Sequence, residues 1–311
     1  AAKMLNLYSD PEVSLLTKAV AENLGLEKNQ VLMTNGSDEI LNFAFMAYGD
    51  KNHPFVFPDI TYGFYKVFAE LNGVPYEQIP LNSDFILPVN DFCNLPHTLF
   101  IANPNAPTGM ALEIGQIEDI LRANPDHVVL IDEAYVDFGT ESSVPLTAKY
   151  DNLLVVQTFS KSRSMAGARL GFAIANEGLI ADLEKIKFST NPYSINRMTL
   201  AAGLATLKAD DACMANCQRI IDTRQATVAR LRQMRFEVLP SKANFVFARH
   251  SHADGGFLYR QLKARGVLVR HFESPRIRDF LRITIGTDEQ MQRLVEETKR
   301  WLMQQITGGK Q

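Results

Sequence analysis

Five short apolar runs in the first two-thirds of the chain each end in a polar or glycine-bearing loop. They lie in the segments VLMTNGSDE, PFVFPDITY, LFIANPNAPTG, VVLIDEAY and LLVVQTFSK. Residues 128–131 do not alternate polar with apolar side chains, which indicates a strand covered on both faces. Helical patterns lie between the runs, at 38–48, 63–72 and 114–122. Strands that alternate with helices predict a three-layer α/β/α domain around a mostly parallel sheet.

The last third of the chain has a different pattern. The segments NFVFARH, GVLVRHF and FLRITIG indicate strands, and residues 257–264 and 288–306 indicate helices. A helical stretch at about 200–232 precedes them. We therefore expect a large domain at 1–205 and a smaller α+β domain at 206–311.

Composition excludes some functions. The chain has 311 residues, a net charge of -3 and 46% hydrophobic residues, so it can bury a large core, and its charge does not suggest binding to nucleic acid or to an anionic membrane. Cys93, Cys213 and Cys217 form no disulfide framework and no paired zinc motif. We expect a cytoplasmic protein without a metal site, and we expect the histidines of RHSHADGG to belong to a loop.

Conspicuous polar residues follow the apolar runs. In an open α/β sheet, ligands bind beyond the carboxyl ends of the strands. Asp132 ends one run and Tyr135 comes three residues later, while Ser160, Lys161 and Arg169 follow another. These side chains should therefore meet at one edge of the sheet.

A turn and an amide complete this set. Gly36, Ser37 and Asp38 follow the first run and open a helix, with Ser37 as the expected N-cap. Free backbone N–H groups and the helix dipole favour an anion there. Asn105 follows a third run. Together these groups suit a ligand with a phosphate, a cationic ring nitrogen and an aldehyde, and pyridoxal 5'-phosphate has all three.

Each residue alone has an ordinary structural explanation. Asp132 could be a structural carboxylate, Ser37 only a helix cap and Lys161 a surface lysine, while Tyr62 and Tyr135 could be half-buried tyrosines. Their joint occurrence at strand ends of one domain favours the functional interpretation.

Eight motifs in order resemble the histidinol-phosphate aminotransferase family of fold-type-I pyridoxal-phosphate enzymes, from Tyr8 to Gly286. They are TNGSDEIL, PDITYGFY, NPNAPTG, DEAYVDF, TFSKSRSMAGARLGF, NPYSIN, SKANFVF and LRITIGT. The resemblance implies a transaminase of histidine biosynthesis that uses histidinol phosphate and 2-oxoglutarate.

The resemblance also implies roles for residues around the cofactor. Lys161 would hold the cofactor aldehyde and transfer a proton, Asp132 would pair with the ring nitrogen, and Tyr135 would hydrogen-bond the 3-oxygen. Tyr62 would stack on the ring. The phosphate would be held by the backbone at Gly36, Ser37 and Asp38, with Ser160 and Arg169.

Further implied roles concern the substrate and a second subunit. Arg270 and Arg282 would hold the anionic end of the substrate, near Asn244. Tyr8 would reach the cofactor phosphate of the other subunit in a homodimer. Arg270 and Arg282 flank apolar strand residues and should face inward, whereas we interpret Arg276 and Arg278 as solvated loop charges.

Two positions depart from the family pattern. Ala106 stands where the family often has asparagine before PTG, so Asn105 is the candidate for the missing amide contact. Gln157 stands where arginine is common, and we interpret this as a peripheral change.

Three alternatives remain open. An aromatic or broad-specificity aminotransferase, or a threonine-phosphate decarboxylase, would share the cofactor residues, since a fold does not define a reaction. A nicotinamide dehydrogenase is disfavoured because no GxGxxG follows the first predicted strand. A ligand-binding protein without catalysis is disfavoured by the presence of both Lys161 and Asp132.

Overall fold

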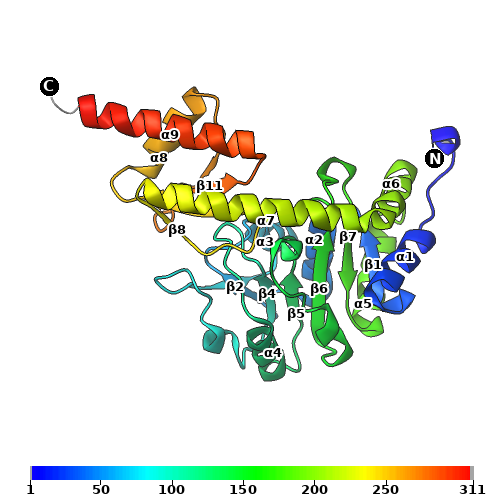
Figure 1. The fold of residues 1–311 in the computed structure, drawn as a ribbon. Coiled ribbons are helices and arrows are strands. Elements are labelled where there is room, and N and C mark those ends of the chain that lie inside the picture. Colours follow the sequence, from blue (N-terminus) through cyan, green and yellow to red (C-terminus); the bar gives the residue numbers. More distant parts are fainter. Residues whose placement is uncertain (1, 309–311) are drawn as a thin grey trace.

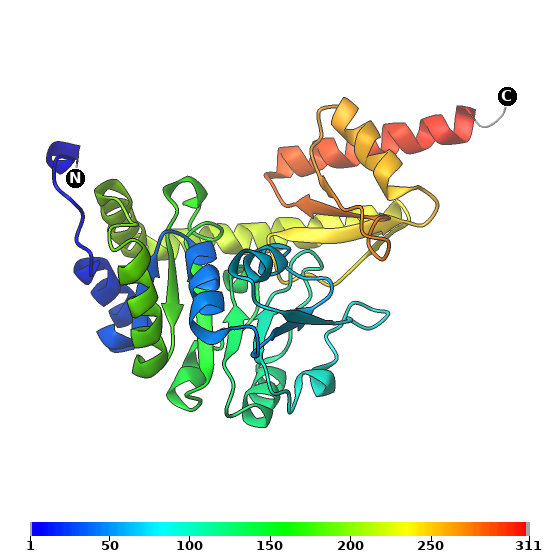
Figure 2. The ribbon, with the colours of Figure 1, turned by 180° about the vertical axis from the view of Figure 1, so that it is seen from behind.

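The computed structural model describes residues 2–308. This part of the chain forms a large sheet flanked by helices and a smaller sheet, and the long helix α7 (Asp210–Gln233) runs from one to the other (Figure 1). The first helical turn, Ala2–Met4, lies beside the large unit, and helix α9 (Asp288–Gly308) lies at the opposite end, beside the small sheet (Figure 2).

The seven-stranded sheet of the described residues is mostly parallel, as predicted. Its strands, in spatial order, are β1 (Val31–Thr34), β7 (Gly171–Ile174), β6 (Leu153–Thr158), β5 (Val129–Asp132), β4 (Thr98–Ala102), β2 (Phe55–Pro58) and β3 (Tyr76–Ile79). Only β7 runs antiparallel to its neighbours, and the sequence patterns missed it. No α-helix lies between β6 and β7, and a parallel strand would need such a crossover.

Alternate residues of the strands point into two separate cores. Leu99 and Ile101 face one side of the sheet, whereas Phe100 and Ala102 face the other. The first side is covered by α1 (Ser14–Leu24), α4 (Ile114–Ala123) and α6 (Arg197–Lys208), and the second by α2 (Ser37–Tyr48), α3 (Phe64–Asn72) and α5 (Glu177–Thr190). This confirms the three-layer prediction and the apolar character of the runs.

The smaller unit has a four-stranded antiparallel sheet. Its strands, in spatial order, are β10 (Arg270–His271), β11 (Phe280–Thr284), β9 (Phe245–His250) and β8 (Phe236–Val238), with helices α8 (Gly255–Ala264) and α9 (Asp288–Gly308). Short 3-10 helices occupy Ala2–Met4, Lys28–Gln30, Val89–Phe92, Val136–Phe138, Val144–Ala148 and Ala166–Ala168.

Two sequence predictions need correction here. The helical stretch at 200–232 is two helices, α6 and α7, because the chain leaves helical geometry at Ala209. The strand predicted for GVLVRHF contains only Arg270 and His271, and Leu268 is 78% exposed. β10 is an edge strand and pairs only with β11, so fewer of the predicted residues are held in strand conformation by hydrogen bonds. The division near residue 205 falls inside α6 and stays a prediction.

No helix among the described residues is long and apolar enough to cross a membrane.

Candidate active site

A pocket opens where β5 and β6 end, beside the first turn of α2. Its lining residues are Ser37, Asp38, Tyr62, Ala102, Pro104, Ala106, Asp132, Ala134, Tyr135, Thr158, Ser160, Lys161, Ala166 and Arg169. Eight of the predicted site residues are among them: Ser37, Asp38, Tyr62, Asp132, Tyr135, Ser160, Lys161 and Arg169. Parallel strands bring their carboxyl ends to the same edge of a sheet, which is why segments distant in sequence meet here.

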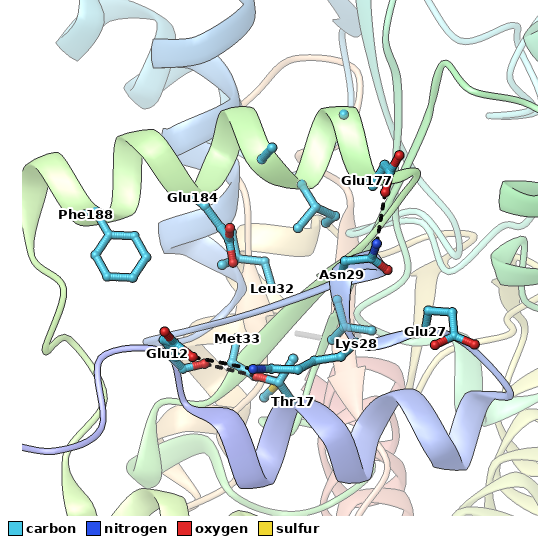
Figure 3. A pocket seen from close by; sticks show the side chains of 14 residues that line it. Glu12, Thr17, Glu27, Lys28, Asn29, Leu32, Met33, Glu177, Glu184 and Phe188 are labelled. Atoms are coloured by element: carbon cyan, nitrogen blue, oxygen red, sulfur yellow. Dashed lines mark hydrogen bonds and ion pairs between the residues drawn. The ribbon is translucent and has the colours of Figure 1, made fainter.

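A larger cavity, of about 790 Å³, lies elsewhere, along β1 between α1 and α5 (Figure 3). Polar groups of its lining pair with each other: Lys28 Nζ lies 3.5 Å from Glu12 Oε2, and Asn29 donates a 2.9 Å hydrogen bond to Glu177. Size alone therefore does not identify the site. The smaller pocket is the candidate because it combines an acid, a lysine, a phenol and a helix N-terminus.

Asp132 lies at the base of the pocket and is only 6% exposed. Burial raises the pKa of its carboxyl to about 6, although hydrogen bonds from the Tyr65 hydroxyl (2.9 Å) and the Ala134 backbone N–H (3.1 Å) act in the opposite direction. A buried carboxylate with a raised pKa is stabilised by a cationic group placed beside it. Asp132 is therefore suited to a ligand with a positively charged ring nitrogen.

Tyr65 is a site residue that the sequence analysis missed. It lies on α3, fully buried, and contributes its hydroxyl to Asp132. The sequence offered one signal for this contact, namely a tyrosine inside the apolar pattern of a helix. A tyrosine buried in this way usually has a hydrogen-bond partner for its hydroxyl.

Lys161 and Tyr135 lie close together in the pocket. Lys161 Nζ is 5.4 Å from the centre of the Tyr135 ring, and the lysine is half-buried. Lys161 comes three residues after β6 and Tyr135 three residues after β5. The pocket thus places an amine and a phenol at neighbouring strand ends.

The turn before α2 is the part of the site at which the sequence predicts an anion. Gly36, at φ 83°, is the N-cap, so the prediction that Ser37 fills this position is wrong. A Cβ atom at Gly36 would lie 2.6 Å from Arg169 Nη2, and one at Gly171 would lie 2.4 Å from Ser37 N. Both glycines permit this close packing, which brings the Arg169 guanidinium to the first N–H groups of a helix.

The carboxylate of Asp38 connects two other pocket residues. It accepts hydrogen bonds from the Tyr62 hydroxyl (2.9 Å) and from Arg169 Nη2 (3.1 Å). Burial and the negative charge of Asp38 raise the pKa of Tyr62, so its hydroxyl stays protonated. These bonds hold the Tyr62 side chain at the pocket wall.

Asn105 does not line this pocket. Its Nδ2 donates to the Ile60 carbonyl and to Thr108 Oγ1, both at 3.0 Å, and its side chain lines a neighbouring apolar cavity. Ala106 lines the pocket instead. This placement does not support the prediction that Asn105 supplies the missing amide contact.

The two predicted substrate arginines lie opposite each other in the small sheet, where Arg270 on β10 pairs with Arg282 on β11. Arg282 is half-buried, as expected, and its guanidinium carbon lies 5.1 Å from the centre of the Phe245 ring. Arg270 is exposed, so the expectation that it faces inward does not hold. Asn244 is half-buried beside Phe245, and its carbonyl accepts a hydrogen bond from Ile285 N.

Arg276 is not a solvated loop charge. Its Nη1 lies 2.6 Å from Asp59 Oδ2, and its Nη2 donates to the Leu81 and Asn82 carbonyls at 2.8 and 3.0 Å. Arg276 therefore ties the segment before β11 to the segments after β2 and β3. Arg278 is exposed, as expected.

Gln157 is not peripheral, because it belongs to a buried network around Glu133. Glu133 accepts hydrogen bonds from Gln157 Nε2 (2.8 Å), Ser142 Oγ (2.6 Å) and the Ser143 backbone and hydroxyl (2.5 and 2.6 Å). Burial raises the pKa of Glu133. The network closes the loop that carries Tyr135.

Tyr8 lies away from the pocket. It is 79% exposed and stacks on Tyr193, with ring centres 4.5 Å apart. Its carbonyl accepts a hydrogen bond from Arg197.

Comparisons with known proteins agree with this geometry. Residues 1–297 match the family model for aminotransferase class I and II. The chain is 49% identical to histidinol-phosphate aminotransferase of Brachyspira hyodysenteriae over 95% of this chain and 84% of that protein. It is 48% identical to the protein of that name from Acinetobacter baumannii, over 96% of this chain and 83% of that protein.

Solved structures share the fold. The histidinol-phosphate aminotransferase of Sinorhizobium meliloti, in complex with pyridoxal-5'-phosphate, matches with a TM-score of 0.86 at 23% identity, over 97% of this chain and 85% of that chain. L-threonine-O-3-phosphate decarboxylase of Porphyromonas gingivalis matches with a TM-score of 0.82 at 21% identity, over 96% and 91%. The fold is thus common to enzymes that carry out different reactions.

Proposed function

The chain belongs to the histidinol-phosphate aminotransferase family of class I and II aminotransferases, and from this premise we propose that it transfers the amino group of histidinol phosphate to 2-oxoglutarate. The observation that carries the proposal is the pocket in which Asp132, Lys161, Tyr135 and the first turn of α2 meet. Its cofactor, pyridoxal 5'-phosphate, supplies an aldehyde that takes up the amino group and a ring that accepts electrons from the substrate.

The pocket residues fit this cofactor at three points. Asp132 would face the ring nitrogen, because its buried carboxylate is stabilised by a cation. The N-terminus of α2 and the guanidinium of Arg169 would hold the phosphate, with Ser160 beside them. The amine of Lys161 would bind the aldehyde.

The chain's own residues would then carry out the proton transfer. Lys161 Nζ would remove the proton from the substrate carbon that bears the amino group and deliver it to C4′ of the cofactor, and in the second half of the reaction it would move a proton in the reverse direction, to the keto carbon of 2-oxoglutarate. Asp132 would keep the ring nitrogen protonated, and the Tyr135 hydroxyl would donate to the ring 3-oxygen. Tyr62 covers the face of the ring and limits its movement.

Arg282 is the candidate for binding the anionic end of the substrate. Its guanidinium is half-buried, and Nε has no hydrogen-bond partner among the described residues. A forked guanidinium matches the oxygens of a phosphate dianion as well as those of a carboxylate. Arg270, opposite on the same face, would add a second positive charge at the exposed side.

We propose a homodimer in which Tyr8 reaches the cofactor phosphate of the other subunit. The support is a group of exposed apolar side chains at the N-terminal end of the molecule: Leu5, Leu7, Tyr8, Leu15, Tyr193 and Met198. Exposed apolar groups of this kind are typical of protein–protein interfaces. We also propose a cytoplasmic location, supported by three cysteines that are free in the structure.

The proposal is tested by product analysis. The purified protein with pyridoxal 5'-phosphate, histidinol phosphate and 2-oxoglutarate should form glutamate and the keto product. Release of carbon dioxide from threonine phosphate would favour the decarboxylase, and equal kcat/KM for phenylalanine would favour a broad aromatic aminotransferase.

Arginine variants test the binding of the substrate anion. Arg282→Lys should lower kcat/KM for histidinol phosphate by roughly 10- to 100-fold, because lysine cannot make the forked contact. Arg270→Lys should have the smaller effect, since Arg270 is exposed, and should affect the phosphate ester more than 2-oxoglutarate. Unchanged kinetics in Arg282→Lys would contradict this assignment.

A further inference from the structure

Phe245 lies between two residues of the proposed site. It begins β9 and is 2% exposed. Its ring centre lies 5.1 Å from that of Tyr135, with the ring planes at 87°, and 5.1 Å from the guanidinium carbon of Arg282. Because Tyr135 in turn lies 5.4 Å from Lys161 Nζ, a continuous series of contacts joins the lysine to the arginine.

The surroundings of Phe245 hold it in this position. Ala106 and Ala243 pack with it in a small apolar cluster that Tyr135 borders. The small side chain of Ala106 thus packs against the cluster that holds the Phe245 ring.

The backbone next to Phe245 is also tied to the loop that carries Tyr135. Arg224 is buried on α7, and its Nη1 donates both to the Ala243 carbonyl (2.5 Å) and to the Phe138 carbonyl (3.0 Å). The Ser241 hydroxyl donates to the Phe245 carbonyl (2.5 Å). The Phe245 ring therefore has a defined position relative to both Tyr135 and Arg282.

We propose that Phe245 is a positioning residue that sets substrate preference by fixing Arg282 relative to Tyr135 and Lys161. The proposal rests on the proposed function, in which the amino group of the substrate lies near Lys161 and its anion at Arg282. A rigid ring that contacts Tyr135 on one side and Arg282 on the other defines the distance that a substrate must span. Phe245 thus selects substrates by the separation between amino group and anion, and it also restrains the Tyr135 hydroxyl.

Phe280 offers a matched control on the same sheet. It is 1% exposed, and the guanidinium carbon of Arg249 lies 5.0 Å from its ring centre, much like Arg282 beside Phe245. Phe280 packs with Phe85 and Phe247 in another cluster, away from Tyr135. Phe280→Leu therefore removes an equivalent buried ring and cation contact while leaving the contacts of Phe245 with Tyr135 and Arg282 in place.

The test compares Phe245→Leu with Phe280→Leu in the enzyme loaded with cofactor. Phe245→Leu should raise KM for histidinol phosphate by roughly 2- to 30-fold, the range of a cation–π contact, more than it raises KM for 2-oxoglutarate. It should also shift the pH midpoint of the visible absorbance of the bound cofactor, because Tyr135 donates to the ring oxygen. Phe280→Leu should leave the KM ratio and the midpoint unchanged.

Equal KM ratios and equal absorbance midpoints in the two variants would overturn the proposal, because Phe245 would then act only as a core residue. Failure of the proposed function has a different signature, namely that the wild type does not use histidinol phosphate. In that event the same comparison is made with the amino donor that the wild type accepts, and the absorbance titration tests the link to Tyr135 directly.

Discussion

The hydroxyl of Tyr65 donates a hydrogen bond of 2.9 Å to Oδ2 of Asp132, and both side chains are buried. The bond joins α3 to the end of β5 and orients the carboxylate in the pocket. It lowers the pKa of Asp132, but burial has the larger effect, and the pKa is about 6. Keeping Asp132 ionised in the folded, cofactor-free protein therefore has a cost in free energy.

This cost predicts how the stability of the cofactor-free protein depends on pH. Between pH 4 and pH 6 the folded protein binds a proton at Asp132 that the unfolded chain has released, so the free energy of unfolding falls as the pH rises. Asp132→Asn should remove this dependence and stabilise the cofactor-free protein at pH 7 by up to about 3 kcal/mol. Urea unfolding at several pH values measures both effects.

The same variant should have very low turnover, because an amide does not keep the ring nitrogen protonated. Tyr65→Phe is the control for the unfolding experiment. It removes a hydrogen bond that lowers the pKa of Asp132, so the pH range in which stability falls should extend to higher pH instead of disappearing. Near-normal turnover of Asp132→Asn would contradict the assigned role.

Lys161 should be the residue that binds the cofactor. Borohydride treatment of the yellow holoenzyme should fix the cofactor on the peptide that contains Lys161, and peptide mapping would detect it. Lys161→Ala should prevent labelling and lower the rate by at least roughly 10²–10⁴-fold, because a positioned proton-transfer group is lost. Label on Lys185, an exposed lysine, would refute the assignment.

Gln157 should matter for stability. Gln157→Leu removes one donor from the buried carboxylate of Glu133 and should lower the free energy of unfolding by roughly 1–3 kcal/mol. The exposed Gln218 on α7 provides a control, because Gln218→Leu should change stability by less than about 0.5 kcal/mol. Equal effects in urea unfolding would show that Gln157 is peripheral after all.

Arg276 should restrain the segment after β3. Leu81 N donates to Asp59 Oδ1 while Arg276 pairs with Oδ2 of the same carboxylate. Arg276→Ala should speed amide hydrogen exchange around Leu81 and lower stability by up to about 1 kcal/mol, since the pair is partly exposed. Arg278→Ala should change neither, and unchanged exchange in both variants would exclude a restraining role.

Tyr8 should act across the dimer interface. A mixture of inactive Tyr8→Phe with inactive Lys161→Ala should regain activity, because a two-fold dimer formed from both chains contains one intact site. Sedimentation analysis would show whether the protein is dimeric. A monomer at working concentration, or a fully active Tyr8→Phe, would remove the basis of the shared-site proposal.

The sequence by itself determined five of the seven strands of the large sheet and the local part of the site. The period of apolar residues depends only on neighbours along the chain, so the runs around Leu130 and the helix after Gly36 were predictable. Asp132, Lys161 and Ser37 belong to the pocket because each ends or follows its own strand, and parallel strands end at one edge. Position along the chain was enough to place these residues together.

Only the tertiary structure decided which distant side chains meet. Tyr65 contacts Asp132 across 67 residues and Arg276 contacts Asp59 across 217, and no local pattern encodes such pairs. The same holds for Asn105, whose amide turns toward Ile60 and Thr108 instead of the pocket, and for the antiparallel β7. Side-chain direction and strand direction depend on how separate segments pack, since each buried polar group takes the partner that packing brings within hydrogen-bond distance.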